Sequence, residues 1–291
     1  MSTVEDLAQR FDADRRHLRS VAFRLLGSVA DAEDAVQSAW LKASRADPDT
    51  IENLTGWFTT ITAREAVDQL RARTRRAEQP LDESDRVPGM VSAPADEDLL
   101  LADSVSRALL VVLDRLSPAQ RVAYVLHDVF GLAFETIGDL LDRSPAAAKK
   151  LASRARGRLH AGRSAEPRRT AEHLKIVEAF LAASRGGDIS TLLGLLAPDV
   201  VRRVDRVLVP DDVPTEIRGS SQVAEETRRF TQRAQAGAVL LIDGAPGIAI
   251  APRGRVQALL RIRIGDDDRI HAIDIIGDAD RLRAAVLALP H

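Results

Sequence analysis

The stretch LDRLSPAQRVAYVLHDVFGLAFETIGDLLDRSPAAAKKLASRARGRL, residues 113–159, decides the fold of the middle of this chain. It contains the pairs Ser117-Pro118 and Ser144-Pro145, and a serine followed by proline is typical of a helix start. Apolar residues recur at helical spacing on both sides of the short segment from Asp142 to Ser144. Two helices joined by so tight a turn have the dimensions of a helix-turn-helix.

The helix expected after Ser144 is basic. From Arg143 to Arg163 the sequence has seven basic residues and no acidic one. Opposite its apolar stripe lie four polar side chains: Lys149, Lys150, Ser153 and Arg154. A recognition helix meets base edges and phosphates on that side. The alternative is a solvated basic helix in a bundle, and we favour DNA binding because of the tight turn and the missing acids.

The first 76 residues predict three helices. Gly27 is a natural helix stop, and Ser28 can cap the second helix. One side of this second helix is apolar, whereas the other presents polar residues and one leucine at helical spacing: Asp34, Gln37, Ser38 and Leu41.

The third helix starts near Thr55 and ends in the arginine-rich run 71–76. Along it we expect an aromatic ring, hydroxyls and arginines to form one surface: Trp57, Thr59, Thr60, Arg64, Arg71 and Arg75. Asp68 can pair with Arg64 or Arg71. Such a set can grip unstacked single-stranded bases. The residues alone leave open a plainer interpretation, in which Trp57 is a core residue and the arginines are solvated.

The composition is that of a globular protein of about two domains, or three small ones, with 291 residues, 45% hydrophobic and 29% charged. The absence of cysteine excludes disulfides and thiolate metal sites, and the histidines are too scattered to imply a metal or any other cofactor. We expect no membrane span and no export signal, and hence a cytoplasmic protein. Residues 77–98 contain three prolines and seven acidic residues against one basic, which predicts a linker.

From Thr170 the pattern changes. Two helices are expected first, the second capped by Asp188, and alternating runs follow between residues 200 and 276. A helix at 223–236 interrupts these runs, and a last helix is expected at 280–287. The pattern predicts an α+β domain at 170–291 with helices on one side of an antiparallel sheet.

Two separate stretches resemble the extracytoplasmic-function (ECF) sigma factors of the sigma-70 family. LRSVAFRLLGSVADAEDAVQSAWLKA (18–43) and WFTTITAREAVDQLRARTRR (57–76) look like region 2, and residues 113–159 look like region 4. The resemblance implies a region 2 domain at 1–76, the linker at 77–98 and a region 4 helix-turn-helix domain at 99–165, both domains being all-α. It also implies a bacterial transcription initiation factor that binds core RNA polymerase and promoter DNA and is a monomer when free.

The resemblance assigns roles to the surfaces described above. Asp34, Gln37 and Leu41 would dock on the β′ clamp helices of the polymerase, and region 4 would meet the β flap. The helix 57–76 would open the −10 element and capture a flipped base, while Lys149, Lys150, Ser153 and Arg154 would read the −35 element as duplex. This sequence has Ser38 where many members have Glu, and Ala63-Arg64 where many carry Arg-Asn.

Beyond residue 170 the opening HLKIVEAFLAASRGGDISTLLGLLAPDVV (173–201) resembles SnoaL-like (NTF2-like) domains, which are α+β cones with a pocket. Some sigma factors carry such an extension as a built-in regulator, so the resemblance implies a C-terminal domain that contacts the sigma regions and modulates their activity. One group carries a glycine-rich Asp-Gly-Gly-Gly-Arg motif where this chain has Ala251-Pro-Arg-Gly-Arg255. We therefore expect a related but distinct subgroup, whose C-terminal domain is regulatory.

Two other classes of function stay open. A SnoaL-like enzyme fused to a DNA-binding module would draw on His271, Asp274, Asp199 and Arg261. His271 and Asp274 point to opposite faces of one strand, so we assign no catalytic residue. Arg261 and Arg263 share a face and could hold an anion, which suits a one-component regulator that senses a ligand. A repressor of that class would dimerise on a palindrome.

Overall fold

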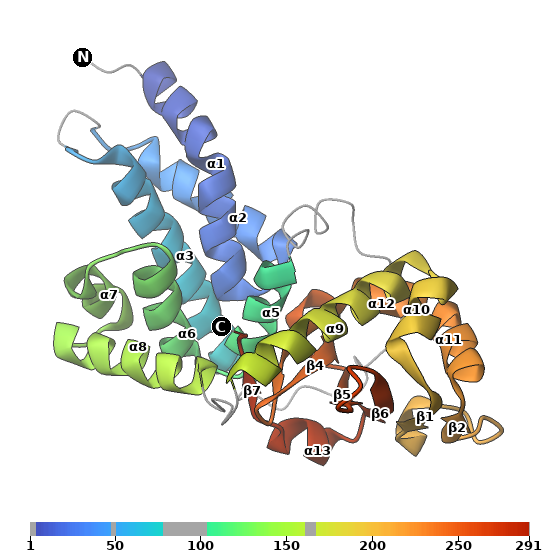
Figure 1. Cartoon of the computed structure of the whole chain (residues 1–291). Coiled ribbons are helices and arrows are strands. Elements are labelled where there is room, and N and C mark those ends of the chain that lie inside the picture. The colour runs from blue at the N-terminus through green and yellow to red at the C-terminus, as the bar shows by residue number, and fades with distance from the viewer. Residues whose placement is uncertain (1–3, 48–50, 78–103, 161–166, 291) are drawn as a thin grey trace. The chain divides into compact units, whose positions relative to one another are not determined.

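The computed structural model describes residues 4–47, 51–77, 104–160 and 167–290 (Figure 1). The linker expected at 77–98 lies almost wholly outside these ranges. The chain forms two compact units, one made of residues 1–102 and 116–156, the other of residues 103–115 and 157–291. Each unit is therefore built from two separate parts of the sequence.

Three long helices open the first unit: α1 (Val4–Leu26), α2 (Val29–Ala43) and α3 (Leu54–Ala77). Gly27 follows α1 with a φ of 73°, and the Ser28 hydroxyl accepts a hydrogen bond from the Asp31 backbone N–H at the start of α2. An aromatic cluster joins the three helices, because the Phe11 ring centroid lies 5.2 Å from that of Trp40 and 5.0 Å from that of Phe58. The three predicted helices are confirmed.

The same unit contains the predicted helix-turn-helix. Its elements are α6 (Pro118–Tyr124), a π-helical turn η3 (Val125–Val129), α7 (Phe134–Leu141) and α8 (Pro145–Leu159). Ser117 and Gln120 form a capping box on α6, and the Ser144 hydroxyl accepts a hydrogen bond from the Ala147 N–H. Between α7 and α8 the chain turns through Asp142, which has the left-handed φ of 53°.

The second unit is an α+β domain with a seven-stranded sheet in the order β2-β1-β6-β5-β4-β3-β7. The strands are β1 (Leu196–Val204), β2 (Glu216–Arg218), β3 (Gly237–Ile242), β4 (Ala245–Ile250), β5 (Ala258–Ile264), β6 (Ile270–Ile276) and β7 (Leu287–Ala288). Short 3-10 turns follow β1 and β4, η4 (Arg206–Leu208) and η5 (Pro252–Gly254). The α+β class is confirmed.

The sheet is mixed rather than antiparallel, which corrects one expectation. β1 runs parallel to β6, with Arg202 opposite Ile273. The helices and hairpins between these strands make a connection long enough for a parallel pair. The last helix, α13 (Ala279–Ala284), is shorter than the expected 280–287. Leu287 lies instead in the short strand β7, where it pairs with Ile242 of β3.

Helices cover one face of the sheet. They are α9 (Pro167–Gly186), α10 (Ile189–Leu195), α11 (Ser220–Arg229) and α12 (Thr231–Gln235), and the Asp188 side chain caps α10 as expected. Phe180 of α9 packs in one buried apolar cluster with Ile248 and Ile273 of the sheet. The single helix expected at 223–236 is two, because the chain breaks at Phe230.

A further helix, α5 (Ser104–Leu113), belongs to this second unit although the expected boundary at residue 99 groups it with region 4. Ala108 and Val111 of α5 share a buried cluster with Leu240, Ala249 and other residues of the sheet. These two sheet residues alternate with Val239 and Ile248, which face α9. Helix α5 therefore covers the sheet face opposite to α9.

Candidate nucleic-acid interface

The outer side of α8 is the most clearly formed candidate surface. All four side chains predicted there are exposed: Lys149, Lys150, Ser153 and Arg154. Ala148, Ala152 and Ala155 are fully buried on the other side. Arg156 pairs with Asp128 of η3 at 3.1 Å, and this ion pair holds α8 against η3. Within the described ranges none of the four side chains makes a hydrogen bond or ion pair, so their polar groups are available to a ligand.

On α3 the predicted surface divides in two. Trp57 is half-buried, with its ring centroid 5.5 Å from that of Phe58, and Arg64 is exposed. The Thr60 hydroxyl donates to the Gly56 carbonyl at 2.9 Å and is half-buried. Trp57, Thr60 and Arg64 follow helical spacing and share one face. Ala63, one of the two positions that depart from the family pattern, is fully buried.

Thr59 lies on the other side of α3, in the core. It is 3% exposed, and its hydroxyl donates to the Thr55 carbonyl at 2.7 Å. The same oxygen lies 3.1 Å from His17 Nε2 of α1. Thr59 was expected on the same surface as Thr60, but neighbouring residues on a helix are about 100° apart. Its hydroxyl therefore serves helix packing rather than the outer surface.

Arg71 reaches from α3 to the turn of the helix-turn-helix. Its Nη2 lies 2.5 Å from Asp142 Oδ2 and donates to the Leu140 carbonyl at 3.1 Å, while its Nη1 lies 3.4 Å from Asp68 Oδ1. The expected Asp68 pair is thus confirmed for Arg71. The contact with Asp142 could not be foreseen, because the partners are 71 positions apart. The side chain of Arg75 lies outside the described part of the chain.

Other contacts join the first helices to the helix-turn-helix within this unit. The Arg121 Nε of α6 donates to the Arg24 carbonyl of α1 at 2.8 Å. The Arg24 guanidinium lies 5.8 Å from the Phe130 ring centroid, and the His17 ring meets the same phenyl ring edge-on at 5.3 Å. The end of α1 and the turn after η3 therefore pack together through cations and aromatic rings.

A third surface lies on α2. Asp34 and Gln37 are exposed, and the Leu41 side chain is 53% exposed, which is unusual for a leucine. Ser38 is half-buried beside them. In the described residues neither Asp34 nor Gln37 has a partner. An exposed leucine flanked by partner-free polar groups has the composition of a protein-binding surface.

The polar candidates of the second unit do not converge on one site. His271 Nε2 lies 2.8 Å from Asp267 Oδ1, and its Nδ1 lies 3.9 Å from Asp199. Asp274 instead pairs with Arg203 at 3.6 Å, and Arg261 pairs with Asp243 at 2.5 Å. His271 and Asp274 therefore have different partners, and the pairing of β6 shifts register between Ile270 and Ala272, on either side of His271. Asp267 was not among the candidates, because it lies in the turn before the strand.

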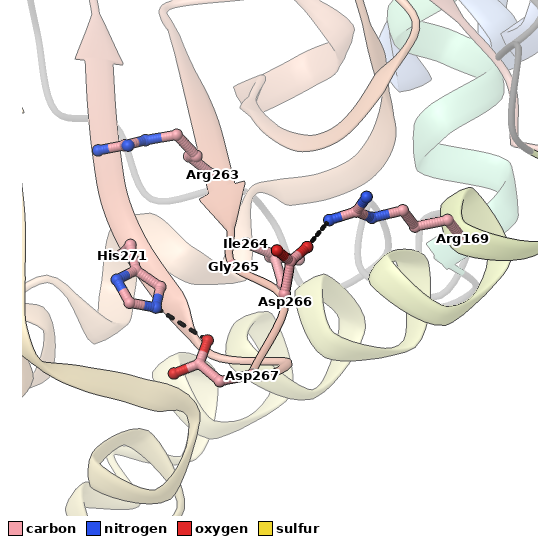
Figure 2. A pocket seen from close by; sticks show the side chains of 7 residues that line it. All are labelled: Arg169, Arg263, Ile264, Gly265, Asp266, Asp267 and His271. Carbon is pink, nitrogen blue, oxygen red and sulfur yellow. Dashed lines mark hydrogen bonds and ion pairs between the residues drawn. The ribbon is translucent and has the colours of Figure 1, made fainter.

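His271 and Asp267 line an open cavity of about 460 Å³, together with Arg169, Arg263, Ile264, Gly265 and Asp266 (Figure 2). Arg169 of α9 pairs with Asp266, and the exposed Arg263 extends from β5. The hydrogen bond with His271 holds the pKa of Asp267 below its usual range. The cavity thus has both positively and negatively charged side chains around it, at the end of the β5–β6 hairpin.

Inside the second unit lies a buried ion pair. Arg202 of β1 is 3% exposed, and its Nε donates to Glu226 Oε2 of α11 at 2.6 Å. A second bond runs from Arg202 Nη2 to Glu226 Oε1, so the pair is bidentate. The remaining Nη1 is buried and has no partner among the described residues. Such a pair joins the sheet to α11.

The described ranges contain neither a group of side chains suited to bind a metal ion nor a helix suited to span a membrane. No three histidine, aspartate or glutamate side chains gather there in a way that could hold a metal ion. None of the helices described is long and apolar enough to cross a lipid bilayer.

Comparison with known proteins finds family matches in the N-terminal and middle parts of the chain. Residues 11–76 match the family Sigma-70 region 2, and residues 106–159 match Sigma-70, region 4. The ECF RNA polymerase sigma factor SigJ of Mycobacterium tuberculosis is 39% identical over 230 residues, which cover 77% of this chain and 72% of that protein. The crystal structure of SigJ is similar over 94% of this chain and 98% of its own, with 33% identity and a TM-score of 0.44.

Part of the chain is also similar to a further solved structure. A SnoaL-like protein of unknown function from Burkholderia thailandensis covers 38% of this chain and 96% of its own length, with 18% identity and a TM-score of 0.29.

Proposed function

Because this chain belongs to the ECF RNA polymerase sigma factors, we propose that α2, α3 and α8 perform the three contacts of such a factor and that the C-terminal domain modulates them. Sigma factors bind core RNA polymerase and promoter DNA, and they are not enzymes. The activity is placed in the cytoplasm, where both partners are found.

The contact with core polymerase is assigned to α2. Asp34, Gln37 and Leu41 stand exposed on one side of the helix, and the two polar residues have no partner in the described ranges. Leu41 supplies apolar area that is removed from water on docking, and the carboxylate and amide orient the partner helices. We assign their partner as the β′ clamp helices, and that of region 4 as the β flap.

The −10 element is assigned to α3. Trp57 and Arg64 can stack on unpaired bases and neutralise phosphate, with Thr60 between them, and Arg71 adds a further cation toward the end of the helix. Arg75 is assigned to the same element from the sequence alone. Thr59 supports this surface from inside through His17 rather than touching DNA. Because Ala63 is buried and Arg64 exposed, the base preference of members with Arg-Asn at these positions is not carried over.

The −35 element is assigned to α8, and its geometry is the observation that carries the proposal. Lys149, Lys150, Ser153 and Arg154 form an exposed row with buried alanines behind them, on the second helix of a helix-turn-helix. The long donors of Lys and Arg reach phosphates and guanine edges in the major groove, and the serine fits either.

The test is promoter-dependent transcription with purified core polymerase and the full chain. The quadruple replacement of Lys149, Lys150, Ser153 and Arg154 by alanine should abolish the specific transcript while core binding is retained. Replacing Arg261 and Arg263 of the second unit by alanine is the control for lost positive charge. If the quadruple variant initiates as well as the unaltered chain, α8 is not the −35 reader.

A further inference from the structure

Helix α5 belongs to one domain by its sequence and to another by its packing. By sequence it opens the match to region 4, which begins at residue 106. By packing it belongs to the C-terminal domain, since Ala108 and Val111 lie with apolar sheet residues in one buried cluster. The sheet and tail residues of that cluster are Ala238, Leu240, Ile242, Ala249, Ala251, Leu259, Ile276, Ala285 and Leu287. Without α5 part of this apolar surface would be exposed to water.

Polar contacts fix both ends of α5 to the same domain. The Arg107 Nη1 donates to the Gln235 carbonyl at 2.6 Å, at the end of α12. At the other end, the Arg115 Nη2 donates to the Leu282 carbonyl of α13 at 2.9 Å. Between them Leu110 is 4% exposed and lies against Gly254 of η5, where a Cβ would stand 3.5 Å from the Leu110 Cβ.

The chain returns to the domain at the end of α8. The Leu289 N–H donates to the Leu159 carbonyl at 3.0 Å, which ties the last residues of the chain to the last turn of that helix. Residues 116–156, which hold the helix-turn-helix, therefore leave the C-terminal domain after Arg115 and re-enter it before Leu159. In topological terms the helix-turn-helix is an insertion.

We propose that this sheet face is the binding surface for α5 and that α5 stays on it while the chain acts as a sigma factor, so that both ends of the helix-turn-helix remain connected to the C-terminal domain. The proposal deepens the proposed function, on which its transcription readout rests. Leaving the sheet would expose Ala108, Leu110 and Val111 together with the apolar cluster beneath them. A new partner would have to offset that whole loss, whereas an inserted helix-turn-helix can reach DNA with α5 in place.

The chain has no cysteine, so a single disulfide can test this directly. In the full chain, Leu110→Cys combined with Gly254→Cys places two Cβ atoms about 3.5 Å apart, within the range of a disulfide. Under mild oxidation we expect one intramolecular disulfide. With core polymerase and promoter, the oxidised chain should initiate within about two-fold of its reduced form, because the bond fixes an arrangement that is already populated.

Two results would overturn the proposal. If the oxidised chain loses initiation by about tenfold or more and a reductant restores it, α5 must leave the sheet during function. If no disulfide forms in the full chain, the sheet does not hold α5 in solution. The single Gly254→Cys variant controls for a side chain at the left-handed φ of 76°.

A second readout does not depend on transcription. Val111→Asp places a charge in the apolar cluster and should lower the thermal midpoint of the C-terminal unit, whereas Asp114→Ala, an exposed position next to α5, should not. Equal midpoints for the two variants would contradict the proposal. A failure of the unaltered chain to transcribe, with the disulfide formed and this contrast observed, would instead count against the proposed function.

Discussion

Arg71 of α3 and Asp142 of the helix-turn-helix turn are joined by an ion pair of 2.5 Å. The arginine belongs to the surface assigned to the −10 element, and the aspartate stands immediately before the helix assigned to the −35 element. The two elements that we assign to promoter DNA are thus joined by Arg71, whose guanidinium can pair either with Asp142 or with a DNA phosphate. The pair is open to solvent, with side chains 40% and 80% exposed, so its contribution to stability is small.

The first prediction concerns this pair. Asp142→Asn removes the charge, and asparagine tolerates the left-handed backbone at this position. Freed from Asp142, Arg71 should favour promoter DNA, and open-complex formation should become about two to five times faster, since an exposed pair is worth about 0.2–1 kcal/mol. Asp139→Asn, an exposed position on α7, is the control. Equal rates for both variants would show that the pair does not restrain Arg71.

The second prediction concerns α8. Lys149→Ala and Arg154→Ala should each weaken binding of the full chain to −35 duplex DNA by about 1–3 kcal/mol if the side chain reads a base edge. A side chain that binds only phosphate should instead weaken all sequences alike and lower the salt slope by about one. Titrations at several salt concentrations, on cognate and scrambled duplexes, separate the two. A variant that alters neither quantity would remove its residue from the interface.

The third prediction concerns α2. Leu41→Asp and Asp34→Lys should each weaken binding to core polymerase by about tenfold or more, because a buried interface centre tolerates neither a charge nor its reversal. The unfolding midpoint should stay unchanged, since both side chains are exposed. Glu52→Lys, an exposed position in the segment before α3, is the matched charge reversal and should bind normally. Undiminished binding of the Leu41 variant would place the polymerase contact elsewhere.

The fourth prediction concerns the buried ion pair. Glu226→Gln leaves Arg202 buried without its countercharge and should reduce the free energy of unfolding by about 3 kcal/mol. The neighbouring Glu225→Gln removes a solvent-exposed pair with Arg228, at 2.7 Å, and should leave the free energy of unfolding nearly unchanged. Chemical denaturation of the two variants makes the comparison. Equal costs would mean that Arg202 finds another partner when Glu226 is neutralised.

The local features of the fold could be predicted from sequence because they depend on neighbouring residues. Ser28, Ser117 and Ser144 cap helices by bonding to backbone groups only three positions away. The outer row of α8 followed from helical spacing in the same way. Thr59 was expected on the outer surface of α3 but is buried, because it packs against His17 of α1, a contact that no local pattern specifies.

The non-local features could not be predicted. The Arg71–Asp142 contact and the parallel pairing of β1 with β6 join segments about 70 positions apart, and no local pattern specifies such a partner. Helix α5 shows the same limit in another form. Its apolar residues predict that one face is buried, yet the sequence does not say which of two domains supplies the opposing surface.

The most direct test of the sigma-factor assignment of these surfaces is start-site mapping with purified core polymerase and a promoter that the full chain recognises. We predict one specific transcript that requires the chain. This transcript should be lost both in the quadruple α8 variant and in Leu41→Asp, with binding to core polymerase kept only in the quadruple variant. A chain that binds neither core polymerase nor promoter, or a transcript that survives both variants, would contradict it.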